Sequence, residues 1–120
     1  MTFNPSQQLA IYILAQALIK ADGMVHPLEN VCWNTVALKL HWLEPADDDL
    51  AACSVDEALA VVATMSADEK RFLAAFFTMI VLADERLTTE EQDLLHRIIT
   101  TAQMPALPYA QCPAILNEYL

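Results

Sequence analysis

The chain has almost no glycine: among its 120 residues only Gly23 is one. A glycine-rich phosphate loop is therefore excluded, and tight hairpin turns have little support. Basic residues are also scarce, because 6 Lys and Arg stand against 16 Asp and Glu, giving a formal net charge of −10. This charge argues against binding to nucleic acid or to an anionic membrane surface. It fits a cation, a basic partner or simple solubility.

The sequence also lacks paired cysteines and long hydrophobic runs. Cys32, Cys53 and Cys112 form no CxxC pair, which argues against a disulfide framework and a zinc knuckle and favours free thiols in a reducing compartment. The longest apolar run covers residues 72–83, whereas a membrane span needs about 20 residues. No basic segment precedes the first apolar stretch, as a signal peptide requires. We expect one cytoplasmic domain over residues 1–120, with no membrane span.

The sequence is rich in helix-capping signals and in alanine and leucine. Asn4 precedes Pro5 at the start of the first apolar stretch, and Ser54, Ser66 and Thr88 are each followed three residues later by Glu. These signals predict an all-α fold of about seven helices, arranged as an antiparallel bundle. The predicted helices cover approximately residues 5–22, 27–44, 46–53, 54–65, 66–83, 88–102 and 111–119.

One segment of the sequence is repeated. Residues 20–29, KADGMVHPLE, align with residues 82–91, LADERLTTEE, and the apolar positions upstream of both segments also match. Each copy consists of an apolar helix, an acidic corner and a second helix. The sequence therefore predicts two similar helical hairpins, with repeat units at about residues 5–42 and 67–104.

Each predicted corner carries two acidic residues, Asp22 with Glu29 and Asp84 with Glu91. The glutamates occupy the third position of a helix, where a carboxylate is favourable. The aspartates end a helix and face the negative end of its dipole, which is unfavourable by about 0.3–1 kcal/mol. Either they bind backbone N–H groups of the turn, or they hold a cation.

The spacing of these acids matches the second half of a calcium-binding EF-hand loop. The two earlier ligand positions of such a loop are occupied here by Leu18 and Lys20, and by Ile80 and Leu82. Neither copy can therefore form a complete EF-hand site. A divalent cation would have to be bound by the four corner carboxylates together or with water.

The doubled motif, KADGMVHPLE and LADERLTTEE, resembles the signature of the TerB-like family. That family includes the tellurite-resistance protein TerB and the N-terminal domain of the DjlA co-chaperone, and the resemblance covers residues 8–102. It implies an all-helical fold with internal two-fold similarity, a bacterial cytoplasmic setting and a stress-associated, non-enzymatic role. It also implies divalent-cation ligands at Asp22, Glu29, Asp84 and Glu91. The second copy departs from the pattern at Glu85 and Arg86.

The sequence offers no catalytic or cofactor-binding residues. It contains no GxSxG or HExxH motif, and the pairs Asp93–His96 and His26–Glu29 are too few for a di-metal centre. We therefore predict a protein that is not an enzyme. Two functions remain open: a module that binds a divalent cation, or an interaction domain for an unknown protein partner that includes self-association as a homodimer. The second rests on the high apolar content: with Trp33, Trp42 and a fully apolar fifth helix, we do not expect one bundle to bury every apolar side chain.

Overall fold

The helices begin and end close to where the capping signals place them. The structure, a computed structural model, describes residues 2–21, 23, 27–42, 44–83 and 88–120. Within these ranges there are seven α-helices, one short 3₁₀ helix and no strand, which confirms the all-helical prediction. The elements are α1 (Pro5–Ile19), α2 (Pro27–Lys39), α3 (Asp47–Ala51), α4 (Val55–Ala63), α5 (Ala67–Leu82), α6 (Thr89–Thr101), η1 (Tyr109–Gln111) and α7 (Cys112–Tyr119).

The starts of α1 and α5 are built in the same way. The side chain of Asn4 accepts a hydrogen bond from the N–H of Gln7 at 2.8 Å, and the Gln7 side chain accepts one from the Asn4 N–H at 2.9 Å. Ser66 and Glu69 form the same reciprocal pair at 3.2 and 3.0 Å. The second pair lies 62 residues after the first. Each capping box satisfies two backbone donors that the helix cannot pair internally.

The repeat in the sequence is also a repeat in the structure. α1 begins at residue 5 and α5 at residue 67, and α2 (27–39) and α6 (89–101) are related by the same shift of 62. After α2 and α6, His41 and Gln103 both adopt φ of 56°. In both places the next residue donates a backbone hydrogen bond to the carbonyl five positions earlier at 2.9 Å. This left-handed exit, usually made by glycine, closes both hairpins identically.

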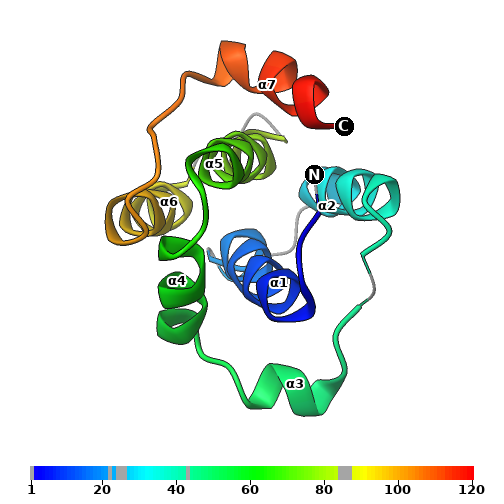
Figure 1. Ribbon diagram of the computed structural model, residues 1–120. Helices are drawn as coiled ribbons and strands as arrows, with labels where there is room; N and C mark the ends of the chain where they lie inside the picture. The colour runs from blue at the N-terminus through cyan, green and yellow to red at the C-terminus, as the bar shows by residue number, and fades with distance from the viewer. Residues whose placement is uncertain (1, 22, 24–26, 43, 84–87) are drawn as a thin grey trace.

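The two hairpins pack around a common centre formed by α1 and α5 (Figure 1). α2 crosses over to pack on α5, and α6 contacts both central helices. α4 covers α1 most extensively, while α7 covers α5. The central helices are therefore enclosed on most sides. Every buried residue of α1 has a buried equivalent in α5: Ala10, Ile11, Leu14, Ala15, Leu18 and Ile19 in α1 correspond to Phe72, Leu73, Phe76, Phe77, Ile80 and Val81 in α5.

The two tryptophans pack against the ring of Phe76 in α5, and part of the Trp42 surface stays exposed. Trp33 is only 9% exposed and stacks on Phe76 with ring centroids 5.7 Å apart. Trp42 is half-buried, at 5.5 Å from Trp33. These rings attach α2 to α5. The large apolar residues that are exposed lie elsewhere, at Leu28, Val31, Leu38, Tyr109 and Leu120.

The two left-handed exits give a test of the repeat. The left-handed conformation costs a residue with a Cβ atom about 1–2 kcal/mol. Glycine avoids this cost but loses more backbone entropy on folding. We expect His41→Gly and Gln103→Gly each to raise the free energy of unfolding by about 0.5–1 kcal/mol, measured by urea denaturation. His96→Gly, on the exposed side of α6, is the matched control and should lower it by about 1 kcal/mol. A loss of stability in the first two variants would contradict the shared geometry.

Candidate functional site

Of the four predicted cation ligands, the structure describes the two glutamates. Glu29 and Glu91 are each the third residue of their helix, α2 and α6, and both side chains have 0% exposure. They are related by the same 62-residue shift as the hairpins. Asp22 and Asp84 lie outside the described residues. The sequence correctly placed the glutamates at helix starts but did not predict that they are buried.

The start of α6 shows how such a carboxylate is held. Thr88 caps the helix by accepting a hydrogen bond from the Glu91 N–H at 3.2 Å, and its hydroxyl donates to Glu91 Oε1 at 3.1 Å. This arrangement turns the Glu91 side chain back towards the helix N-terminus, whose positive dipole end attracts a carboxylate. Capping residue and glutamate therefore fix each other.

One oxygen of this buried carboxylate remains without a hydrogen bond. Glu91 Oε2 is inaccessible to solvent and has no hydrogen-bond partner among the described residues. An ionised oxygen in such a place is costly unless a proton, a hydrogen bond or a cation neutralises it. Carboxylate oxygens are the donors that Ca²⁺ and Mg²⁺ prefer, so the chemistry of this residue fits a hard divalent cation.

The described residues do not by themselves complete a metal centre. Within this part of the chain no group of three or more His, Cys, Asp or Glu side chains is close enough to hold an ion. The acidic run Asp47, Asp48 and Asp49 starts α3 and is exposed, as expected for acids in the first turn of a helix. Any complete site at the corners therefore needs donors from outside the described ranges, or water.

The cysteines have environments that suppress reactivity. Burial raises the pKa of the Cys32 thiol to about 11, with a further contribution from the negative charge of Glu29. Burial likewise raises the pKa of Cys53 and Cys112. A thiol attacks as its thiolate, so all three are poor nucleophiles at neutral pH.

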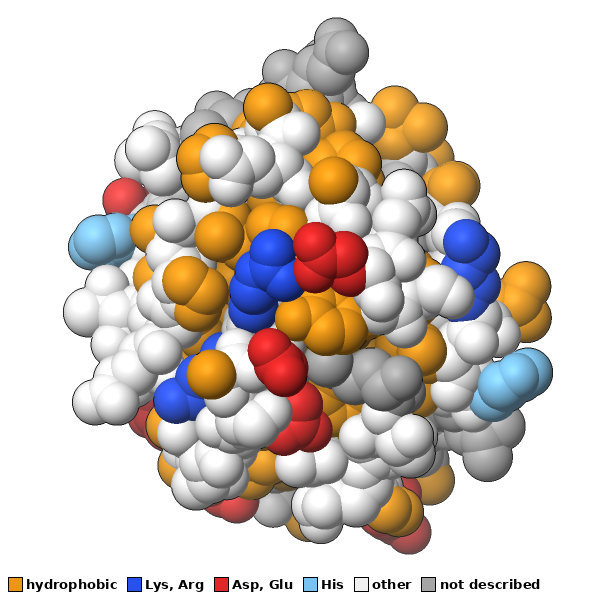
Figure 2. All heavy atoms as spheres, turned by 45° about the horizontal axis from the view of Figure 1, so that its top comes forward, with side chains coloured by type: hydrophobic (Ala, Val, Ile, Leu, Met, Phe, Trp, Pro, Cys, Tyr) orange, Lys and Arg blue, Asp and Glu red, His pale blue; other side chains and the backbone are white. Residues whose placement is uncertain are grey.

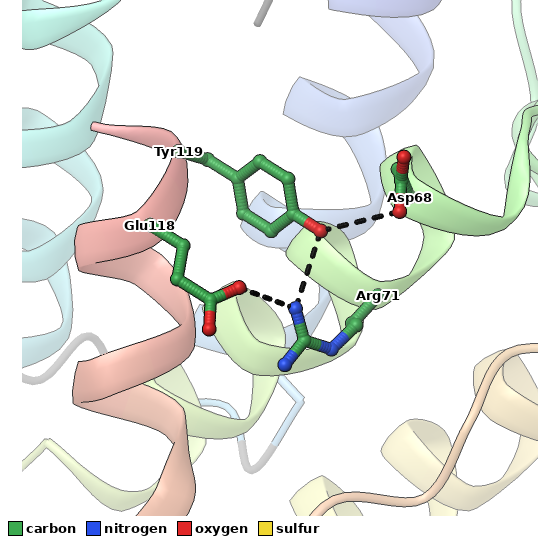
Figure 3. Close-up of polar contacts among 4 residues, drawn as sticks. All are labelled: Asp68, Arg71, Glu118 and Tyr119. Atoms are coloured by element: carbon green, nitrogen blue, oxygen red, sulfur yellow. Dashed lines mark hydrogen bonds and ion pairs between the residues drawn. The ribbon is translucent and has the colours of Figure 1, made fainter.

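A polar cluster that the sequence did not predict fastens α7 to α5 (Figure 3). Arg71 donates to Glu118 at 2.6 Å and to the Tyr119 hydroxyl at 3.3 Å, and Tyr119 donates to Asp68 at 3.4 Å. The bond to Glu118 is the main cause that raises the pKa of Arg71. The ion pair is partly exposed, with side-chain exposures of 38% for Arg71 and 55% for Glu118, so it contributes little stability by itself while it joins α7 to α5.

An apolar groove of about 400 Å³ lies between α2, the end of α5 and the α7 segment. Leu28 and Val31 form one wall, and Tyr109 and Leu120 contribute to the other. Lys39 is the one charged side chain among the described lining residues. Figure 2, which looks onto the side of α7, shows hydrophobic side chains reaching the surface around the charged ones.

Comparison with known proteins identifies the fold and goes no further. No protein-family model matches the chain, and no curated protein matches it. Among solved structures, it is similar to the crystal structure of a protein of unknown function from Porphyromonas gingivalis W83, with a TM-score of 0.79 and 20% identity over 98% of both chains. At this identity the likeness establishes the all-helical architecture alone. Within the described part, no helix has the length and apolarity needed to cross a membrane.

The pKa of Cys32 predicts how its reactivity depends on pH. In the native protein, the rate of its alkylation by iodoacetamide, followed by mass spectrometry, should rise with a midpoint near pH 11. The thiol of the unfolded chain should titrate near its ordinary value of 9.0. Between these values the unfolded chain has lost a proton that the folded chain keeps, so the free energy of unfolding should fall as pH rises. A native midpoint near 9 would contradict the buried environment.

Proposed function

We propose that this chain is a TerB-like, non-enzymatic helical module of the bacterial cytoplasm that binds a divalent cation at its acidic corners and serves a stress-associated role. The observation that carries the proposal is the pair of fully buried glutamates, Glu29 and Glu91, at equivalent positions of two hairpins. Folded chains rarely bury a glutamate completely, and here a glutamate is buried at the same place in both copies of the repeat.

In this proposal, each corner contributes two oxygen ligands to the cation. Glu29 and Glu91 would supply oxygen ligands from the first turns of α2 and α6, with Asp22 and Asp84 as the second donor of each corner. The bound cation would supply positive charge where the protein places negative charge out of contact with water. Its effect on the fold would be to hold the start of the second helix against the end of the first.

Thermal unfolding tests this proposal. The protein is unfolded in EDTA and then in millimolar Ca²⁺, Mg²⁺, Mn²⁺ or Zn²⁺, one ion at a time. An ion present at 100 times its dissociation constant should add about 2.7 kcal/mol to the free energy of unfolding. Asp22→Asn combined with Asp84→Asn should abolish this gain. No stabilisation by any of the four ions would overturn the cation proposal.

Substituting the buried carboxylates separates ligation from general charge effects. We expect Glu29→Gln and Glu91→Gln each to reduce the gain from the ion, because both remove an ionised oxygen donor. Glu90→Gln is the matched control, since it removes the same charge from the same turn of α6 at an exposed position. It should leave the gain unchanged. Equal losses in all three variants would point to nonspecific screening instead of ligation.

A second candidate function is protein interaction without any metal. The observation that favours it is the exposure of large apolar side chains on α2, with Leu38 at 79% and Val31 at 56%. Exposed apolar residues that cluster on one element commonly mark a contact surface.

A further inference from the structure

The exposed apolar residues of α2 form a regular stripe. Leu28, Val31, Thr35 and Leu38 follow the spacing of three, four and three residues that aligns side chains along one side of a helix. All four are exposed, Leu28 by 53%. The Thr35 hydroxyl donates to the Val31 carbonyl at 2.8 Å, so it is satisfied within α2. The α2 stripe, as we call these four residues, is about 15 Å long and has the pattern of a coiled-coil seam.

The fold does not require apolar residues at these positions. The equivalent positions of α6, 62 residues later, hold Glu90, Asp93, Arg97 and Thr100. They form an ordinary polar surface, and Arg97 is paired at 2.6 Å with Asp56 of α4. α2 and α6 occupy the same place in the two hairpins, but the outward residues of α2 are mostly apolar and those of α6 are polar.

The attachment of α2 to the core uses its other side. Trp33 and Val36 are buried, and Trp33 stacks on Phe76 of α5. The α2 stripe makes no comparable contribution to the core, because its members remain exposed. Its apolar character is therefore free to serve a contact outside the chain, and substitutions there should leave the fold intact.

The charge pattern indicates which partner can approach. The chain carries a net charge of −10, so two copies repel each other over most of their surfaces. The exposed residues of α2 include no acid, because Glu29 is buried, and Lys39 is their one charged member. The outward side of α2 is thus a surface where two copies can meet without opposing carboxylates.

We propose that a second copy of this chain binds the α2 stripe, with the two α2 helices antiparallel about a two-fold axis. The stripe is complementary to itself in this orientation, since Leu28 meets the partner subunit's Leu38 and Val31 meets the partner subunit's Thr35. Each such contact occurs twice by symmetry. Tyr109 and Leu120, 48% and 40% exposed across the groove from α2, extend the apolar surface beside the helix pair.

This inference rests on the second candidate function, protein interaction without a metal, and does not depend on the cation proposal.

The stripe consists of four side chains and is small beside the roughly 800 Å² per partner of a standard interface, so we expect a weak dimer. Sedimentation equilibrium in EDTA, from micromolar to millimolar protein, should show a monomer–dimer equilibrium. EDTA keeps this result separate from any effect of a cation. A monomer at every concentration would overturn the proposal and leave the stripe to a helix of another protein.

Leu38→Glu tests whether the stripe carries the contact. It places a carboxylate in the seam and should weaken dimerisation by at least about tenfold, equivalent to 1.4 kcal/mol. Thr100→Glu is the matched control, because it adds the same charge at the equivalent position of α6. It should change the dissociation constant far less. Circular dichroism should show both variants folded, and equal weakening by both would attribute the effect to net charge.

The orientation has its own test in a pair of charged substitutions. Leu28→Lys alone and Leu38→Glu alone should each weaken the dimer. The double variant Leu28→Lys/Leu38→Glu should recover much of the loss, because antiparallel helices bring opposite charges together. In a parallel pair, like charges would lie against each other at both positions, and the double variant would form the weakest dimer of the three. That result would overturn the antiparallel arrangement.

Discussion

The structure depends on the burial of two apolar helices that need cover on nearly every side. α1 and α5 lie against each other at the centre, and each buried residue of α1 has a buried equivalent in α5, from Ala10 and Phe72 to Ile19 and Val81. Neither hairpin can bury its first helix alone, because its second helix covers one side only. α2 therefore packs on α5, and α4 and α7 complete the enclosure of α1 and α5 respectively. The duplication is stable because each copy supplies the surface that the other lacks.

Within this duplication, the positions at which the copies differ are more informative than those at which they agree. The two copies share the capping boxes of α1 and α5, the lengths of α2 and α6, the left-handed exits and the buried glutamates. The outward sides of α2 and α6 are not shared. On α6, Arg97 pairs with Asp56 of α4, whereas α7 leaves an apolar groove beside α2. The same scaffold thus carries a polar surface in one half and an apolar one in the other.

The capping residues in the sequence predicted where helices begin, because helix capping depends on residues close together in the chain. Asn4, Ser66 and Thr88 satisfy donors within three residues of themselves, so helix starts could be located from the sequence. The sequence could not decide which side of α2 faces the core, because apolar residues occur on both, with Trp33 and Val36 on one and Leu28 and Leu38 on the other. That choice depends on the rings of α5. The cluster of Arg71 and Glu118 joins residues 47 positions apart and left no local signal. At the candidate site, capping placed Glu29 and Glu91, but their burial follows from tertiary packing.

The buried carboxylate and the exposed stripe begin in the same turn of α2, where Glu29 points inwards and its neighbour Leu28 outwards. The proposed cation ligand and the proposed dimer seam are therefore neighbours in the sequence and on the helix. If both proposed ligands bind, linkage requires that the cation change dimer affinity by the same factor as the dimer changes cation affinity. In α6, Glu91 is equally buried but the outward positions that follow it are polar, so the proposed interface lies beside the first corner. Any coupling between cation and dimer therefore arises at the first corner, from a scaffold that otherwise repeats itself.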